Sequence, residues 1–195
     1  MLLLIIMNSS ELSKIIESNF QNVDNETRDN IIKFSSFIEL NKGSYLITEG
    51  KRHHYFYLMI KGGVKSYYAK ESKEVCTWFA FENEIIGTTS TLQGLPSNET
   101  VELLEDSEFI RFNITQMKEL TQTNLKMSQL LNNLWAEHAL FLEAKLYLLQ
   151  FTNSQERLNA LIKYNSEILQ RVSLKDIASF LGVSRETLSR IRAKK

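Results

Sequence analysis

Hydrophobic positions are spaced in three different ways along the chain, and the changes in spacing predict its architecture. Over residues 8–36 apolar side chains recur at intervals of three and four, which indicates helices. From about residue 37 to 112 they form short β-branched or aromatic runs punctuated by glycine, at 44–48, 55–60, 64–68, 75–80 and 108–112. Such runs are typical of a β-sandwich, roll or barrel. Helical spacing returns from Asn113 onward. The pattern therefore predicts an α+β protein.

The longest uninterrupted helical pattern covers residues 124–151, which contain no Gly or Pro. Its apolar positions recur alternately four and three residues apart, as in a coiled-coil seam that only Lys145 interrupts: Met127, Leu131, Leu134, His138, Phe141 and Leu148. Such a seam suits contact with a second copy of the chain, although burial within one subunit would give the same pattern. We predict a homodimer through this seam, and we expect His138 to be packed rather than a ligand.

Residues 173–192 predict two short helices joined by a tight turn. Ser173 and Ser184 are suited to capping the two helices, and Gly182 stands where the first must end in a backbone conformation that favours glycine. Apolar residues from Leu174 to Ile191 share one face, and Arg185, Glu186, Ser189 and Arg190 fall on the opposite face. This is the pattern of a helix-turn-helix, whose second helix enters the DNA major groove. An ordinary helical hairpin with a basic face is the alternative.

Charge is distributed in a way that agrees with this interpretation. The whole chain has 23 Lys and Arg against 23 Asp and Glu, for a net charge of zero. Residues 171–195 alone carry seven basic and two acidic side chains, for a net charge of +5. Positive charge gathered in one segment is what binding to phosphates requires.

Other chemistries find little support in the composition. A single cysteine, Cys76, is incompatible with a disulfide framework or an iron–sulfur cluster. The apolar residues 1–7 are too short for a membrane helix and lack the features of a signal peptide, and Met7 is an alternative start. No nucleophile motif or phosphate loop is present, so we expect neither an enzyme nor a metal site. We expect a soluble cytoplasmic protein without contact with a membrane.

Two stretches of the sequence resemble the bacterial Crp/Fnr regulators. Ser184-Arg-Glu-Thr-Leu-Ser-Arg190 is closely similar to the recognition helix of that family, and Tyr45–Gly50 with Tyr57–Tyr67 resembles its β-roll hairpin. The resemblance spans about residues 10–192. It implies a cyclic-nucleotide-binding-like β-roll domain with N-terminal helices at 1–123, a dimerisation helix at 124–151 and a (winged) helix-turn-helix domain at 152–195.

The junction of the last two parts is also marked in the sequence. Thr152 and Gln155 fit a helix capping box, so 152–154 is the expected hinge. The family often has a β-wing, which here would come from residues 169–172.

The resemblance also implies roles for individual residues. Arg185, Glu186 and Arg190 correspond to the base-reading residues of the family. An arginine can bond guanine O6 and N7, and a carboxylate can accept from cytosine N4. We expect Lys175, Ser184, Thr187 and Ser189 to contact phosphates, and Lys194 and Lys195 to add non-specific affinity.

The effector site of the family is not matched. Members that bind cyclic nucleotide have a Gly-Glu pair followed by an Arg-Ser or Arg-Thr pair, in which the arginine neutralises the phosphate. Here Thr88 follows Gly87, and Ser97-Asn98-Glu99 stands where the arginine pair should be. No Lys or Arg lies between Lys73 and Arg111. Since a buried phosphate without a cation is strongly penalised, we expect no response to cyclic AMP and no cofactor.

Together these features predict a transcription regulator that binds a roughly palindromic DNA site as a homodimer. Its half-sites should be about one helical turn, or ~34 Å, apart. Double-stranded DNA and a second copy of the chain are the expected partners, with RNA polymerase and an unidentified small-molecule effector as further candidates. The alternative is a ligand-sensing β-roll protein that acts mainly through protein contacts and binds DNA weakly.

Overall fold

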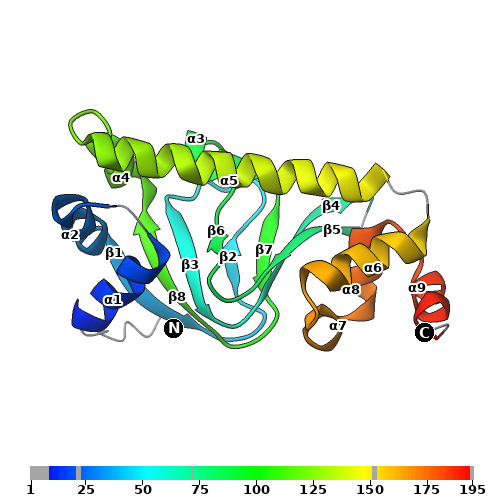
Figure 1. The fold of residues 1–195 in the computed structure, drawn as a ribbon. Coiled ribbons are helices and arrows are strands. Elements are labelled where there is room, and N and C mark those ends of the chain that lie inside the picture. Colours follow the sequence, from blue (N-terminus) through cyan, green and yellow to red (C-terminus); the bar gives the residue numbers. More distant parts are fainter. Residues whose placement is uncertain (1–8, 21–22, 72, 151–152, 194–195) are drawn as a thin grey trace.

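The computed structural model describes residues 9–20, 23–71, 73–150 and 153–193. Over these ranges two N-terminal helices, a β-roll, one long helix and a C-terminal helical domain follow one another along the chain (Figure 1). Some of the sequence-based predictions concern positions outside these described residues, namely residues 1–7, Thr152, Lys194 and Lys195.

The two N-terminal helices are α1 (Ser9–Asn19) and α2 (Asn25–Lys33). Asp24 caps α2 by accepting a hydrogen bond from the Thr27 backbone N–H at 2.8 Å. The apolar positions that predicted these helices, from Leu12 to Ile31, are buried in one core with strand β8 and the start of the long helix. The helical pattern was expected to continue to residue 36, but α2 ends at Lys33 because Ser35 already pairs with Phe112 in a strand.

The β-roll consists of two four-stranded antiparallel sheets with the strand orders β1-β8-β3-β6 and β2-β7-β4-β5. The strands are β1 (Ser35–Leu40), β2 (Tyr45–Ile47), β3 (Tyr55–Lys61), β4 (Val64–Lys70), β5 (Lys73–Ala80), β6 (Ile85–Ile86), β7 (Thr100–Leu103) and β8 (Ser107–Asn113). All five predicted strands are present. The strands β1, β6 and β7 and the short helix α3 (Thr89–Gln93) were not predicted.

The inward faces of the two sheets form a second core that includes Ile47, Met59, Val101 and Phe109, each no more than 1% exposed. The turn between β3 and β4 depends on Gly62, whose φ is +110°. A Cβ atom at this position would collide with Ser107. The two strands can therefore turn this tightly only around glycine.

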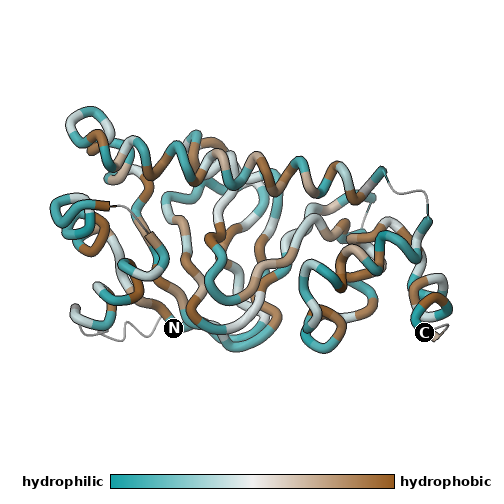
Figure 2. Tube along the Cα trace, in the orientation of Figure 1, coloured by the Kyte–Doolittle hydropathy of each residue, from teal (hydrophilic) through white to brown (hydrophobic). Residues whose placement is uncertain are grey.

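Helix α4 (Ile114–Leu120) leads into α5 (Leu125–Gln150), which runs along the whole length of the roll (Figure 1). The helix expected at 124–151 is thus observed over Leu125–Gln150, and residue 151 lies outside the described residues. Hydrophobic positions recur along α5 between hydrophilic ones (Figure 2). No described helix is long and apolar enough to span a membrane.

The predicted dimer seam lies on the side of α5 that faces its own β-roll. Met127 and Leu131 are buried in the core shared with α1 and α2, and Leu134 packs against that core. His138, Phe141 and Leu148 line cavities between α5 and the roll. The first part of the stripe is therefore buried within its own chain, whereas His138, Phe141 and Leu148 are only partly buried, and a dimer through this seam stays a prediction.

The C-terminal domain comprises α6 (Ser154–Tyr164), α7 (Ile168–Arg171), α8 (Leu174–Leu181) and α9 (Arg185–Ala193). The observed cap of α6 is Asn153, whose Oδ1 accepts the Gln155 backbone N–H at 2.8 Å. Residues 169–172 were expected to supply a wing, but Ile168–Arg171 is a helical turn and no strand occurs among the described residues of this domain.

Candidate DNA-binding surface and effector cavity

The two predicted helices of the helix-turn-helix are α8 and α9, and their local signals act as expected. The Ser173 hydroxyl accepts the Asp176 backbone N–H at 3.1 Å, and the Ser184 hydroxyl accepts the Thr187 N–H at 3.1 Å. Gly182 ends α8 with φ at +66°, and its N–H donates to the carbonyl groups of Ala178 and Ser179. A left-handed residue at this position reverses the chain so that α9 crosses α8.

The buried side of this unit holds the angle between its helices. Ile177, Leu181 and Leu188 are completely buried, and Ala178 is 3% exposed. Arg157 of α6 donates to the Leu181 carbonyl at 2.7 Å and so caps the end of α8. The buried side of helix α9 therefore packs against α8 and α6.

The opposite side of α9 is exposed. Arg185, Glu186, Ser189 and Arg190 all point away from the core, as the sequence predicted. The pKa of Glu186 is lowered by a hydrogen bond from its own backbone N–H and by the Ser184 hydroxyl. Glu186 is therefore an ionised acceptor at neutral pH. Two guanidinium forks and one carboxylate on an exposed helix face can read guanine and cytosine edges.

The residues expected at phosphates divide into two groups. Ser184 and Thr187 lie at the N-terminal end of α9, where their hydroxyls bond each other at 3.1 Å, and Ser189 is exposed on the same helix. Lys175 lies elsewhere: it is exposed on α8, with its Nζ 3.7 Å from the Glu74 carboxylate of β5. Its charge is therefore partly neutralised by the roll.

The C-terminal domain is docked on strand β5 of the roll. The Cys76 N–H donates to the Ser179 hydroxyl at 2.9 Å, which in turn donates to the Glu74 carbonyl at 3.1 Å. The rings of Phe79 and Phe180 lie 5.4 Å apart between centroids. Apolar side chains of β5 and of α6 to α9 form one continuous core across this boundary.

A buried lysine lies beside this contact. Lys65 of β4 has its Nζ 3.4 Å from Asp176 of α8 and 3.5 Å from both Glu74 and Glu102. Burial alone would lower the pKa of Lys65, but the three carboxylates, Asp176 foremost, outweigh this effect and raise it. The ammonium group thus stays charged and links α8 to the roll.

Arg171, at the end of α7, makes the second ionic link. Its guanidinium donates to both Glu82 oxygens at 2.8 Å, to Glu105 at 3.0 Å and to the Gly62 carbonyl at 2.8 Å. It also lies 4.5 Å from the centroid of the Phe81 ring. The hydrogen bond from Arg171 lowers the pKa of Glu82 to about 2. Since Arg171 is engaged with the roll, the net charge of +5 counted from the sequence overstates the positive charge that is available to DNA.

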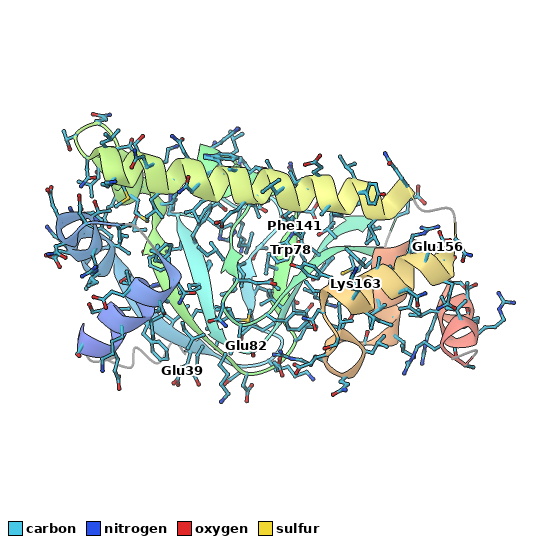
Figure 3. The ribbon with its side chains drawn as sticks, viewed as in Figure 1. Glu39, Trp78, Glu82, Phe141, Glu156 and Lys163 are labelled. Atoms are coloured by element: carbon cyan, nitrogen blue, oxygen red, sulfur yellow. The ribbon has the colours of Figure 1, made fainter. Side chains whose placement is uncertain are left out.

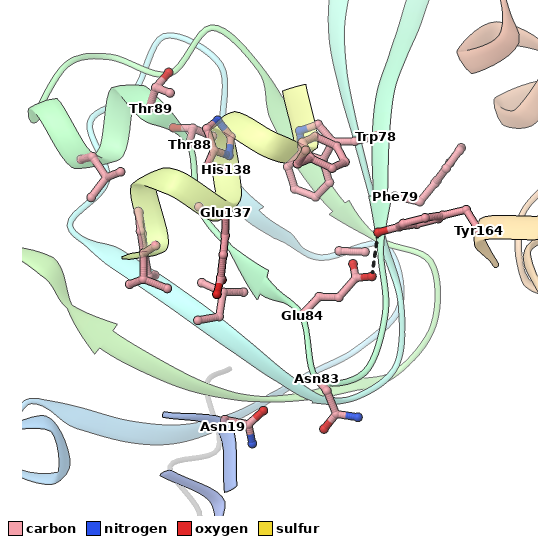
Figure 4. Close-up of a pocket in the computed structure, with 17 residues that line it drawn as sticks. Asn19, Trp78, Phe79, Asn83, Glu84, Thr88, Thr89, Glu137, His138 and Tyr164 are labelled. Atoms are coloured by element: carbon pink, nitrogen blue, oxygen red, sulfur yellow. Dashed lines mark hydrogen bonds between the residues drawn. The ribbon is translucent and has the colours of Figure 1, made fainter. Parts of the chain in front are cut away.

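A cavity of about 440 Å³ opens between the roll and α5 (Figure 4). Glu137 and His138 enter it from α5, and Glu84 enters it from the roll, where its carboxylate accepts a hydrogen bond from the Tyr164 hydroxyl at 3.4 Å. Burial raises the pKa of Glu84 and lowers that of His138. None of the described residues that line the cavity is Lys or Arg. This cavity is unfavourable for an anion.

The residues that replace the arginine pair of the family place a carboxylate inside the roll. Glu99 Oε2 accepts hydrogen bonds from Ser66 at 2.5 Å, Thr77 at 3.0 Å and the Trp78 indole N–H at 3.1 Å. Trp78 and Phe141 lie next to each other beneath α5 (Figure 3). The region therefore already holds a negative group, and that group is well satisfied.

Two cations that are distant in sequence do approach the neighbouring loop. Arg52 donates to the Gly94 carbonyl, and Lys118 donates to the Leu92 carbonyl at 2.8 Å. Neither lines the cavity. The absence of Lys and Arg from residues 74–110 in the sequence therefore agrees with the cavity as the structure describes it.

His53 and the cysteine have local roles. His53 Nε2 accepts the Thr48 N–H at 2.9 Å. Cys76 is buried, and burial raises the pKa of its thiol to about 12. Among the described residues, no three His, Cys, Asp or Glu side chains gather as metal ligands do.

Lys65, Glu99 and Arg171 are the functional candidates that the sequence did not reveal. Each is bound to at least one residue more than 20 positions away, and the partner of Lys65 on α8 is 111 positions away. Glu99 was noted only as a departure from a family motif. No local spacing marks the other two.

Comparison with known proteins identifies a similar domain family and similar solved structures. Residues 37–124 match the family described as cyclic nucleotide-binding domain. Curated protein sequences give no match. FixK2 from Bradyrhizobium japonicum is 20% identical with a TM-score of 0.67, over 82% of this chain and 83% of that one. The c-di-GMP responsive global regulator CLP from Xanthomonas campestris is 17% identical with a TM-score of 0.67, over 88% and 91%.

The Catabolite Activator Protein of Thermus thermophilus is 20% identical with a TM-score of 0.56, over 90% of this chain and 85% of that one. At these identities the likeness establishes the fold. Residues 37–124 are thus similar to the cyclic nucleotide-binding domain family, and the fold over most of the chain is similar to the folds of FixK2, CLP and the Thermus protein.

Proposed function

We propose that this chain is a sequence-specific DNA-binding transcription regulator. The observation that carries the proposal is the exposed face of α9, on which Arg185, Glu186 and Arg190 stand clear of the core while Leu188 anchors the helix. Base reading needs side chains that are free to enter the major groove on a helix that does not itself move. The similar folds of FixK2, CLP and the Thermus protein support the same use.

We further propose that the active form is a homodimer whose interface uses the outer side of α5. Ala136, Leu140 and Glu143 recur there at spacings of four and three, and Leu140 is 64% exposed. This stripe lies opposite the predicted seam, whose first part is already buried within its own chain. A two-fold axis beside α5 would present two α9 helices to a palindromic site.

The regulator is expected to act without cyclic AMP. This part of the proposal is supported by the carboxylates of Glu84 and Glu137 in the cavity, by Glu99 inside the roll and by Thr88 after Gly87. A cyclic phosphate would have to enter a site that offers it no described arginine or lysine.

Binding titrations with a duplex that carries the recognised palindrome test the proposal. Arg185→Ala and Arg190→Ala should each cost about 1–3 kcal/mol on that duplex and relax base preference at one position. Arg28→Ala, in the N-terminal helices, is the matched control and should bind as the wild type does. Equal losses on random and recognised DNA would contradict the base-reading assignment.

A salt series separates this function from the alternative of a sensor that acts through protein contacts. Neutralising several phosphates makes log K fall linearly with log salt, with a slope near −0.9 for each phosphate. A steep slope is expected for the regulator. Weak binding with a shallow slope would favour protein contacts.

A further inference from the structure

A second cavity lies where α5, strand β5 and the C-terminal domain meet. Its volume is about 280 Å³, and α5, β5, α6, α7 and α8 all contribute to its walls. The walls are mostly apolar and include Phe81, Phe141, Leu148, Leu161, Ile168 and Phe180. This cavity adjoins the one that Glu84 and Glu137 line, and Trp78, Phe79, Phe141 and Tyr164 border both.

Lys145 is the single cation in these walls. Apart from Tyr147 and Tyr164, it carries the only ionisable group among the described lining residues. No described carboxylate lies within 4.0 Å of its Nζ, whereas Lys65 has three such partners. Burial lowers the pKa of Lys145, and the charge of Glu99 acts against this shift. The Glu99 Oε2 atom already accepts three hydrogen bonds from other side chains.

The half-buried ammonium group of Lys145 and the aromatic and aliphatic walls around it determine which charge and polarity a complementary ligand would have. One anionic group would supply the counter-charge that Lys145 lacks, and a charge-assisted hydrogen bond is strongest where water is excluded. An apolar body would cover the remaining walls. A cation would be repelled by Lys145, and a neutral molecule would leave its charge uncompensated.

We propose that this cavity binds a small apolar molecule that carries one carboxylate, such as a medium-chain alkanoate. At about 30 Å³ for each water-sized volume, the cavity holds about nine such volumes, which corresponds to roughly ten non-hydrogen atoms. Octanoate has this size. A nucleotide is larger and more polar than these walls accommodate.

The position of the cavity gives such a ligand a route to the DNA-binding helix. It would touch α5, Phe79 and Phe81 of β5, and Ile168 and Phe180 of the C-terminal domain at the same time. Binding would therefore favour one placement of that domain on the roll. This regulatory consequence rests on the proposed DNA-binding function, whereas binding of the carboxylate does not.

Calorimetric titration of the full chain without DNA tests the site directly. Octanoate, 1-octanol and octylamine are the probes, because they share one alkyl chain and differ in charge. We expect octanoate to bind at least about tenfold more tightly than octanol, since one charge-assisted contact is worth about a factor of ten or more, and octylamine to bind least. Lys145→Met should reduce octanoate binding to the level of octanol. Lys163→Met removes an exposed lysine of α6 outside the cavity and should change nothing.

A second variant keeps the test independent of the charge. Ala160→Phe should fill part of the cavity and weaken both octanoate and octanol while Lys145 is retained. Circular dichroism of each variant verifies that it is folded. The proposal is wrong if octanoate does not bind, if octanol binds equally well, or if folded Lys145→Met binds octanoate as the wild type does. Because DNA is absent, a failure of the DNA-binding proposal would not alter these outcomes.

Discussion

Replacing Arg171 with Met should loosen the C-terminal domain from the β-roll. The substitution keeps most of the apolar stem but removes the guanidinium that lies over Phe81, together with its hydrogen bonds to Glu82, Glu105 and the Gly62 carbonyl. These contacts join α7 to the roll, so the main effect is expected on docking and not on the folding of either part.

The size of the effect follows from the Glu82 carboxyl group. Its pKa falls from 4.5 to about 2 beside Arg171, which corresponds to roughly 3.4 kcal/mol at ~1.36 kcal/mol for each pKa unit. Glu82 is 34% exposed and Arg171 19% exposed, so solvent screening reduces the gain to about 1.5–2 kcal/mol. Loss of the contact with Phe81 adds up to ~0.5 kcal/mol. We therefore expect undocking to become easier by about 2 kcal/mol, or roughly 30-fold.

Cys76 provides the assay because it is the single cysteine of the chain and lies in the docking interface. It is 6% exposed, and burial raises the pKa of its thiol to about 12, so a disulfide reagent at pH 8 should react only after the domain undocks. Labelling of Arg171→Met should be roughly 30 times faster than labelling of the wild type. Arg28→Met is the matched control, because it removes an ion pair to Glu17 far from the interface.

One outcome would refute this reasoning. If folded Arg171→Met is labelled at the wild-type rate, then Arg171 does not hold the two parts together. Faster labelling of Arg28→Met to the same extent would mean that Cys76 reports general destabilisation instead of undocking.

Three further outcomes are expected. The pKa of Glu82 is lower in the folded chain, so its contribution to docking is complete above about pH 4.5 and is lost as the pH falls toward 2. Protection of the Cys76 amide against hydrogen exchange should therefore be lower at pH 3 than at pH 5. Equal protection at the two pH values would argue against this link. Gly182→Ala places a Cβ at φ +66° and should destabilise the C-terminal domain by about 1–2 kcal/mol in urea unfolding, whereas an unchanged midpoint would mean that the turn relaxes freely. Leu140→Glu should sediment as a monomer, because it places a charge in the proposed interface. Leu95→Glu changes an exposed loop position and is the control that should stay dimeric. A dimeric Leu140→Glu would place the interface elsewhere.

The elements predicted correctly are those whose signals are local. Ser173, Gly182 and Ser184 each bond a backbone group three or four positions away, so the helix-turn-helix could be inferred from the sequence alone. The same is true of the long helix, which has no interrupting Gly or Pro.

The missed strands depend on distant partners. Residues 35 and 36 were assigned to the helical pattern and residues 37–40 to no individual strand, yet Ser35–Leu40 forms β1 because it pairs with Ser107–Asn113. The two residues of β6 and the four of β7 are too few to show a period. Tertiary pairing decides such segments, and a single sequence does not reveal it.

The predicted seam on α5 shows a different limit. The spacing of Met127, Leu131 and Leu134 correctly identified a stripe that must be covered, but a roll and a partner helix cover such a stripe equally well. The ionic links of Lys65 and Arg171 were missed for a related reason. Their partners lie up to 111 residues away, and they become recognisable only when the roll and the C-terminal domain are in contact.

Selection of bound sites from random duplex DNA, with purified protein in the absence and presence of cyclic AMP, tests the central claim most directly. The account predicts that a palindromic motif containing G and C is enriched without the nucleotide, with half-sites about one helical turn apart. It also predicts the same motif and the same enrichment when cyclic AMP is added. Enrichment only with cyclic AMP would contradict the interpretation of the cavity, and no enrichment in either condition would contradict sequence-specific DNA binding by the protein on its own.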